Sequence, residues 1–347
     1  MAYTTIDDPS AYFQTTLYTG DGGGTRAVTH GGNSDLNADW VWIKDRGTSS
    51  THYIFDSVRG VQKHLSSASN SQELSDANSL KAFNSNSFTL GTSGNVNGNS
   101  RTFASWNWKA GGASTSTNSD GDINGTQTVS QTAGFSVTTY SGNGGSNQRL
   151  GHGLGVTPKI YILKRRDNNG QWVFVNTLID GTLDYLFLET TGAKSNSGRT
   201  LPTSSVVYLE NGGDANESGG THVMYAFAEK KGYSKFGSYT GNGSTDGTFV
   251  YTGFKPAFII AKESSEARDW QLWDNKRLGY NASGGNKNLI PNKTDAEDTY
   301  ADIDILSNGF KLRNSSAAAN KVSQTYIYMA FAENPFVTST GVPACAR

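Results

Sequence analysis

The stretch GYSKFGSYTGNGSTDG occupies residues 232–247, and its centre returns twice elsewhere in the chain. Tyr239-Thr-Gly-Asn-Gly is matched by Tyr18-Thr-Gly-Asp-Gly and by Tyr140-Ser-Gly-Asn-Gly. Asn-Gly is a strong signal for a two-residue hairpin turn, because both central positions of a type I′ turn need positive φ. The sequence therefore predicts, three times over, a strand that enters a Gly-rich turn, and such repetition indicates tandem β-modules.

The match extends beyond the turn. Twelve residues after the three tyrosines lie His30, His152 and Tyr251, which we align with one another. Further on, the apolar runs DWVWIK, KIYILK and AFIIAK bring three lysines into register: Lys44, Lys164 and Lys262. Both faces of each run are apolar and rich in β-branched or aromatic residues, which is typical of a central strand buried on both sides.

These patterns predict an all-β fold of three tandem related β-sandwich modules, jelly-roll or concanavalin-like, with turns rich in Gly and Asn. We place the modules at residues 1–112, 134–231 and 232–347. Residues 113–133 are rich in Ser, Thr, Asn and Gly, and we expect them to form a flexible or extended linker. The second and third modules join directly at Lys231-Gly232, so we expect these two to form the more rigid pair.

Composition excludes several classes of protein. The 347 residues carry a net charge of −1, and the only dense basic run is Lys164-Arg165-Arg166, which is too small to indicate nucleic-acid binding. A single cysteine, Cys345, allows neither a disulfide framework nor a zinc cluster within one chain. The N-terminus does not resemble a signal peptide, and no apolar stretch is long enough to span a membrane.

Aromatic and histidine side chains are the candidate ligand-binding residues. Trp270 and Trp273 lie among charged and polar neighbours, so they are candidate platforms for sugar rings, with core packing as the alternative. Trp40 and Trp42 align with aliphatic or Phe positions of the other modules, which predicts a core role for both. The further candidates are Tyr251, His152 and His30, although a turn histidine bonded to the backbone is the favoured interpretation.

No cofactor and no catalytic group is predicted. Asp120 with Asp122, and Asp302 with Asp304, could supply oxygen ligands to Ca²⁺, but neither pair lies in a full twelve-residue calcium loop. Solvated loop carboxylates are therefore the default, with a bound Ca²⁺ as the alternative. A polysaccharide depolymerase would need two carboxylates about 5–10 Å apart, and the available glutamates show no repeated pair. They are Glu189, Glu210, Glu229, Glu263 and Glu333.

Several phrases together resemble a family of bacteriophage proteins found in marine and cyanobacterial phages. They are GYSKFGSYTGNGSTDGTFVYTGF, GLGVTPKIYILKRRD, TAGFSVTTYSGNG and YIYMAFAENPF. The resemblance covers nearly the whole chain, and it implies a virion structural protein of the tail-fibre type, made in the host cytoplasm and placed in the tail. It supplies no catalytic residue.

The resemblance also implies partners. They are other virion proteins, a host cell-surface glycan or receptor, and further copies of the chain in a trimer, without nucleic acid or membrane insertion. A capsid decoration or head-fibre protein is the alternative location. The first module departs from the others at Trp106-Asn-Trp108, which suggests a separate role such as anchoring to the particle.

Overall fold

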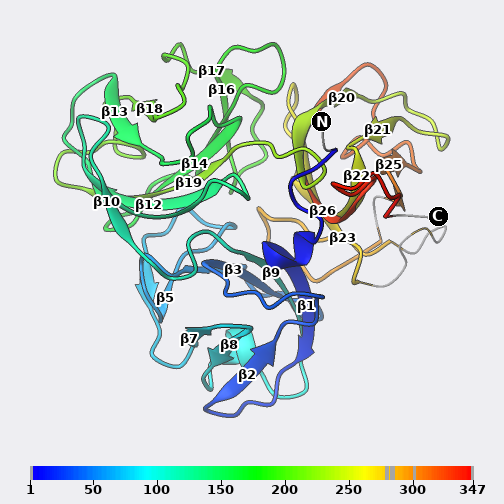
Figure 1. Ribbon diagram of the computed structural model, residues 1–347, viewed down its shortest axis with the longest axis horizontal. Coiled ribbons are helices and arrows are strands. Elements are labelled where there is room, and N and C mark those ends of the chain that lie inside the picture. Colours follow the sequence, from blue (N-terminus) through cyan, green and yellow to red (C-terminus); the bar gives the residue numbers. More distant parts are fainter. Residues whose placement is uncertain (1–2, 278–280, 282–285, 300–301, 345–347) are drawn as a thin grey trace.

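The computed structural model describes residues 3–277, 281, 286–299 and 302–344, so Cys345 lies outside the described residues. Nearly all regular structure in them is antiparallel β-sheet, which confirms the predicted all-β class and is consistent with β-sandwich modules (Figure 1). Within these residues no helix is long and apolar enough to cross a membrane. The predicted boundaries serve below as names for the first, second and third modules.

The elements of the first module are short strands with two brief helical turns. They are η1 (Pro9–Ala11), β1 (Phe13–Thr19), β2 (Arg26–Thr29), β3 (Trp40–Asp45), β4 (Tyr53–Asp56), β5 (Lys63–His64), β6 (Leu74–Ser75), β7 (Leu80–Asn84), β8 (Ser87–Leu90), α1 (Gly94–Asn97) and β9 (Thr102–Trp108).

The remaining described elements are all strands. Residues 113–231 form β10 (Ser116–Asn118), β11 (Gly125–Ser130), β12 (Phe135–Ser141), β13 (Gln148–Gly151), β14 (Ile160–Arg165), β15 (Val173–Asn176), β16 (Asp184–Phe187), β17 (Ser195–Asn196), β18 (Val206–Leu209) and β19 (Thr221–Phe227). The third module forms β20 (Ser234–Thr240), β21 (Phe249–Tyr251), β22 (Phe254–Glu263), β23 (Gln271–Asp274), β24 (Ile303–Leu306), β25 (Gly309–Leu312) and β26 (Thr325–Pro335).

One strand order recurs along the chain. The main sheets run β1-β9-β3-β4, β12-β19-β14-β15 and β20-β26-β22-β23, and the second of these belongs to a larger sheet that also includes β10, β11, β16 and β17. Each main sheet has a smaller companion: β2-β8-β7, β13-β18 or β21-β25-β24. Strands at the same place in the three orders are therefore equivalent. The equivalent sets are β1, β12 and β20; β9, β19 and β26; β3, β14 and β22; and β4, β15 and β23.

Each main sheet buries two apolar faces, because side chains alternate along a strand. On β3, Trp40 and Trp42 face a core shared by all three modules, whereas Val41 and Ile43 face the core of the first module alone. All six residues of β3 are buried, which confirms the predicted two-sided burial of this run and the predicted core role of both tryptophans.

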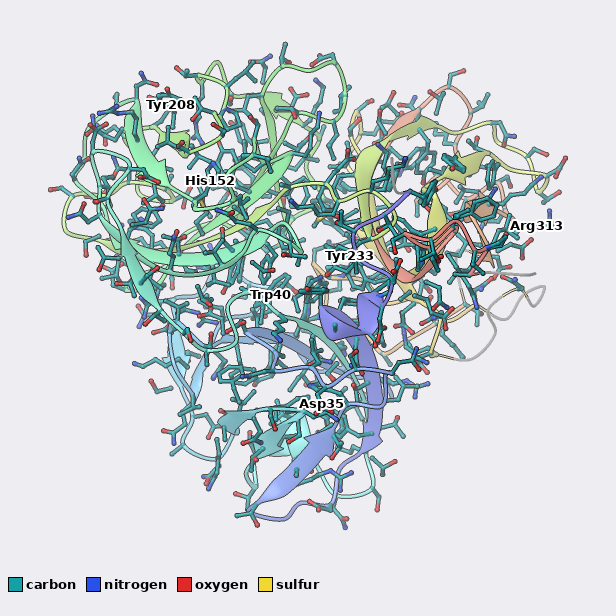
Figure 2. The ribbon with its side chains drawn as sticks, viewed as in Figure 1. Asp35, Trp40, His152, Tyr208, Tyr233 and Arg313 are labelled. Atoms are coloured by element: carbon teal, nitrogen blue, oxygen red, sulfur yellow. The ribbon has the colours of Figure 1, made fainter. Side chains whose placement is uncertain are left out.

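The shared core holds the three modules together as three lobes around a common centre (Figure 1). Trp40 lies where the lobes meet (Figure 2), and its ring stacks on that of Tyr225 with centroids 4.9 Å apart. The rings of Trp108 and Phe258 approach to 5.2 Å, and those of Phe227 and Phe331 to 6.0 Å. Burying rings of this size supplies a large part of the apolar free energy of folding.

Residues 113–133, expected to form a linker, contain β10 and β11 instead. β11 pairs antiparallel with β12 along its whole length, from Ser130 opposite Phe135 to Gly125 opposite Tyr140. Hydropathy patterns do not predict β11, because most of its side chains are Thr, Gln and Ser. Pairing of its backbone with that of β12 holds it in the sheet.

Candidate functional site

The repeated turn is a structural clamp. The hydroxyl groups of Tyr18, Tyr140 and Tyr239 are buried and donate to a backbone carbonyl of the loop, or in the first module of the short helix α1, that precedes the last main-sheet strand of their module. The acceptors are the carbonyl oxygens of Val96, Ala215 and Ala319, at 2.7, 2.6 and 2.8 Å. Each tyrosine thereby ties the turn to that loop.

The first glycine of each turn allows close contact with the same loop. A Cβ atom on Gly241 would lie 2.3 Å from the carbonyl oxygen of Lys321, and equivalent clashes arise at Gly20 and Gly142. The second glycine, Gly243 in the third module, has a φ of +68°, which strongly favours glycine. The phrase therefore recurs because the fold needs it at equivalent places.

A buried asparagine completes each clamp. The amide nitrogen of Asn320 donates to Asn242 Oδ1, and its amide oxygen accepts from the Asn242 backbone N–H, both at 3.0 Å. Asn216 contacts Asn143 in the same two ways, and Asn97 contacts Asp21. These asparagines each lie five residues before a repeated threonine (Thr102, Thr221 or Thr325), a spacing visible in the sequence.

The three aligned lysines are buried at the end of their strands. Each Nζ donates to backbone carbonyl oxygens, and two of these acceptors belong to a neighbouring module: Thr294 for Lys44, and Asn70 for Lys164. Burial lowers the pKa of Lys44, Lys164 and Lys262 to about 8. The lysines therefore act as links within and between modules.

A ring at the start of the fourth strand of each main sheet makes a second link between modules. Trp172 Nε1 donates to the Ser66 carbonyl at 2.7 Å, and Trp270 Nε1 donates to the Phe187 carbonyl at 3.1 Å. His52 takes this position in the first module. Its Nδ1 accepts from Trp42, so its Nε2 carries the proton and donates to Ile290.

Buried charges gather at two of the three contacts between modules. Asp56 accepts from Arg59 and from the Tyr225 hydroxyl, while Glu73 pairs with both Arg59 and Arg166. The equivalent cluster joins the first and third modules through Asp274, Arg277, Glu297, Arg46 and Trp106. In the basic run at 164–166, the lysine is thus buried and both arginines form ion pairs.

Most predicted ligand-binding residues are buried. Trp270 and Trp273 are each 1% exposed, which contradicts their use as sugar platforms and leaves the core alternative. His30 lies 3.0 Å from the Thr16 hydroxyl, and His152 accepts from the Leu154 backbone N–H, so both are turn histidines held by their surroundings. Figure 2 shows His152 inside its lobe.

Tyr251 is the exception, at 54% exposed, and it does not align with the histidines. Strand pairing gives the correct alignment: Val28 faces β8, Leu150 faces β18 and Val250 faces β25 at equivalent positions. The residues two positions later are therefore equivalent, and they are His30, His152 and Thr252. The third module has one extra residue in its turn, which makes the ungapped alignment wrong for Tyr251. Tyr251 and Phe249 instead share the outer face of β21, with Phe249 44% exposed.

One carboxylate of each pair considered as a calcium site makes an ion pair. Asp122 binds Arg149 at 2.6 Å, and hydrogen bonds from this arginine lower the Asp122 pKa to about 2. Asp304 pairs with Arg313, which lies at the outer edge of its lobe (Figure 2). Among the described residues, no cluster of three or more Asp, Glu, His or Cys side chains could hold a metal ion. Glu229 and Glu333, equivalent in sequence, pair with Lys235 and Lys255.

A polar groove lies between the first and third modules. Its volume is about 490 Å³, within the usual range for ligand sites. The floor is β1, from Phe13 to Leu17, and one wall is the loop at 31–33. Residues 275–276 and 332–334 of the third module form the other wall. Sequence patterns could not locate this groove, because its two walls come from opposite ends of the chain.

The chain belongs to the DUF7483 family: a family model described as "Domain of unknown function (DUF7483)" matches residues 8–335. A search of curated proteins and a search of solved structures found no match.

Proposed function

We propose that this member of the DUF7483 family is a non-enzymatic structural protein of a bacteriophage particle. In this proposal it is a tail-fibre component that attaches the particle to the host surface. The resemblance of several sequence segments to phage proteins motivates the assignment. The proposed partners are other virion proteins and a host surface glycan, and further copies of the chain assemble with it.

The arrangement of equivalent sheets around one shared core is the observation that carries the proposal. Fibre proteins of the resembled kind are usually trimers, whereas here one chain supplies three equivalent lobes by itself (Figure 1). The residues repeated in the three modules are tyrosines, glycines, asparagines and lysines that contribute to packing. Such packing suits a rigid receptor-binding domain of a fibre. Weak binding at one site of each chain gains strength by multivalency when a particle carries many copies.

The exposed aromatic pair on β21 is the proposed glycan contact. Phe249 and Tyr251 point outward together, and the Tyr251 hydroxyl lies 3.3 Å from that of Tyr3. An aromatic face suits the apolar face of a sugar ring, and phenolic hydroxyl groups can bond to its hydroxyls. The pair thus replaces the buried tryptophans as the candidate contact.

Competition for the receptor tests this function. Purified protein is added in excess to host cells before the parent phage, and unadsorbed phage is counted. We expect adsorption to fall, and we expect Phe249→Ala with Tyr251→Ala to lose this effect. Leu201→Ala, at an exposed apolar residue of the second module, is the matched control and should still compete.

A capsid decoration protein is the second candidate, favoured by the same threefold arrangement. Three equivalent lobes could dock at a position where three capsid subunits meet, because each lobe would then find the same surface. Unchanged adsorption together with detection of the protein on capsids would support this location and contradict receptor binding.

A further inference from the structure

Among the described residues, no strand pairs with the outer edge of β1. β1 ends its sheet, and its other side pairs with β9 from Phe13 opposite Trp108 to Thr19 opposite Thr102. Just beyond the two ends of this pairing, the Lys109 N–H donates to the Tyr12 carbonyl and the Gly20 N–H donates to the Arg101 carbonyl. Because such bonds alternate along an antiparallel pair, the backbone groups of Thr15 and Leu17 point away from β9.

Of the two equivalent edges, that of β12 is paired with a strand, and that of β20, which also ends its sheet, is capped at one residue. In the second module β11 covers β12, with Thr128 opposite Val137, the residue equivalent to Thr15. In the third module the equivalent residue is Phe236, whose backbone N–H donates to Glu229 Oε1 at 2.8 Å. An open edge is normally protected in proteins, since it can pair with another chain. The first module lacks both of these forms of protection.

The open edge lines the polar groove, whose volume is about 490 Å³. Thr15 lines the groove and is 8% exposed, yet its hydroxyl has no hydrogen-bond partner among the described residues. A buried hydroxyl group is normally bonded. This hydroxyl is enclosed, so the backbone groups of Thr15 and Leu17 are the hydrogen-bonding groups that the edge presents to the hollow.

We propose that β1 accepts an extended strand from another polypeptide, which adds antiparallel to its edge as β11 adds to β12. The strand would be neutral and rich in Thr, Ser or Gln, like residues 125–130, because polar uncharged side chains provide much of the groove lining. Backbone pairing would provide affinity, and the groove walls would select small polar side chains.

Other occupants fit the groove less well. Residues of two modules line the groove beside the edge, which favours a single extended strand over β1 of a second folded copy. The chain's own N-terminal residues are held on the third module, where the Tyr3 hydroxyl donates to the Gly253 carbonyl at 2.7 Å. The inference does not depend on the proposed function, because strand addition needs only the geometry of this groove.

A peptide with the sequence of residues 124–131 is the probe. The peptide is added to the full chain at about 1 mM, which is a typical effective concentration for linked binding partners. It should slow the hydrogen exchange of the backbone amides of Thr15 and Leu17 at least about tenfold. N-methylation of the peptide at the positions of Thr126 and Thr128 should abolish this protection, since those N–H groups would face β1. N-methylation at the positions of Gln127 and Val129 should preserve it.

Two protein variants separate groove binding from other effects. Gly31→Tyr adds a ring to the groove wall where a Cβ meets no atom within 4 Å, so it should fold normally and weaken peptide binding at least about tenfold. Gly212→Tyr, equally free of close contacts in the second module, should bind as the wild type does. Absence of protection in the wild type, or equal protection in Gly31→Tyr, would overturn the proposal.

Discussion

The contact between the first and second modules and the contact between the second and third use equivalent strands, yet among the described residues only the former buries a cluster of charges. At the former, Asp56 holds both Arg59 and the Tyr225 hydroxyl. At the latter, the equivalents of Asp56 and Tyr225 are Asn176 and Met329. The difference shows that the apolar core and the ring-to-carbonyl bonds can join two modules without buried ion pairs.

The charges therefore have another role, which we take to be selection of the correct neighbour. A buried ion pair adds little net stability, because desolvation offsets most of the attraction, but a wrong partner leaves a charge uncompensated. The first module uses one such cluster on each side, to the second module through Glu73 and to the third through Glu297. Its position among the three lobes is thereby specified twice.

The largest effect is expected from removing one charge of a cluster. Asp56→Asn should lower the free energy of unfolding by about 3–5 kcal/mol, because Arg59 stays buried without its main counter-ion. Asp274→Asn should act alike through Arg277. Urea unfolding followed by tryptophan fluorescence measures both.

The neutral contact supplies the control for that experiment. Asn176→Ala should cost only about 1 kcal/mol, the usual value for a hydrogen bond to a neutral group, here from the Leu178 N–H. Equal losses for Asp56→Asn and Asn176→Ala would contradict the distinction between charged and neutral contacts.

The asparagine clamps should give an intermediate effect of similar size in all modules. Asn97→Ala, Asn216→Ala and Asn320→Ala each remove several hydrogen bonds to a buried amide and should cost about 2–3 kcal/mol. Thermal unfolding of the three variants measures the loss. A clear difference among them would show that the modules do not share this element equally.

Part of this organisation could be predicted from sequence because it depends on local pattern. Apolar runs such as DWVWIK indicate strands buried on both sides, and the alignment of Trp42 with Ile162 and Ile260 indicates a core position. The three asparagine clamps were equally visible as a repeated spacing, although a polar loop residue gives no hydropathy signal.

The candidate site could not be predicted so well, because its surroundings come from distant parts of the chain. Charged neighbours in sequence suggested that Trp270 is exposed, yet its ring contacts Phe174 and its N–H bonds to Phe187 of another module. One inserted residue misaligned Tyr251, and only strand pairing reveals the shift. The groove and the open edge of β1 likewise depend on packing between modules.

A smaller effect on stability should follow pH, with the histidines as its source. Burial lowers the pKa of all five histidines, that of His30 to about 4. Between about pH 6.5 and pH 4 the unfolded chain therefore binds more protons than the folded chain, and the free energy of unfolding falls as the pH falls. Urea midpoints measured across this range should show the loss, and His30→Gln should make it less steep.

The smallest effect on stability is expected at the exposed aromatic pair. Tyr251→Ala should change the free energy of unfolding by no more than about 0.5 kcal/mol, as is usual for exposed side chains. Trp270→Ala, at a residue with the same initial claim to ligand binding, should cost about 3–5 kcal/mol because it empties a buried site. If Tyr251→Ala nonetheless reduces competition for phage adsorption, the loss reflects a missing contact and not a damaged fold. If it competes as the wild type does, the glycan contact lies elsewhere on the surface, and β21 loses its proposed role.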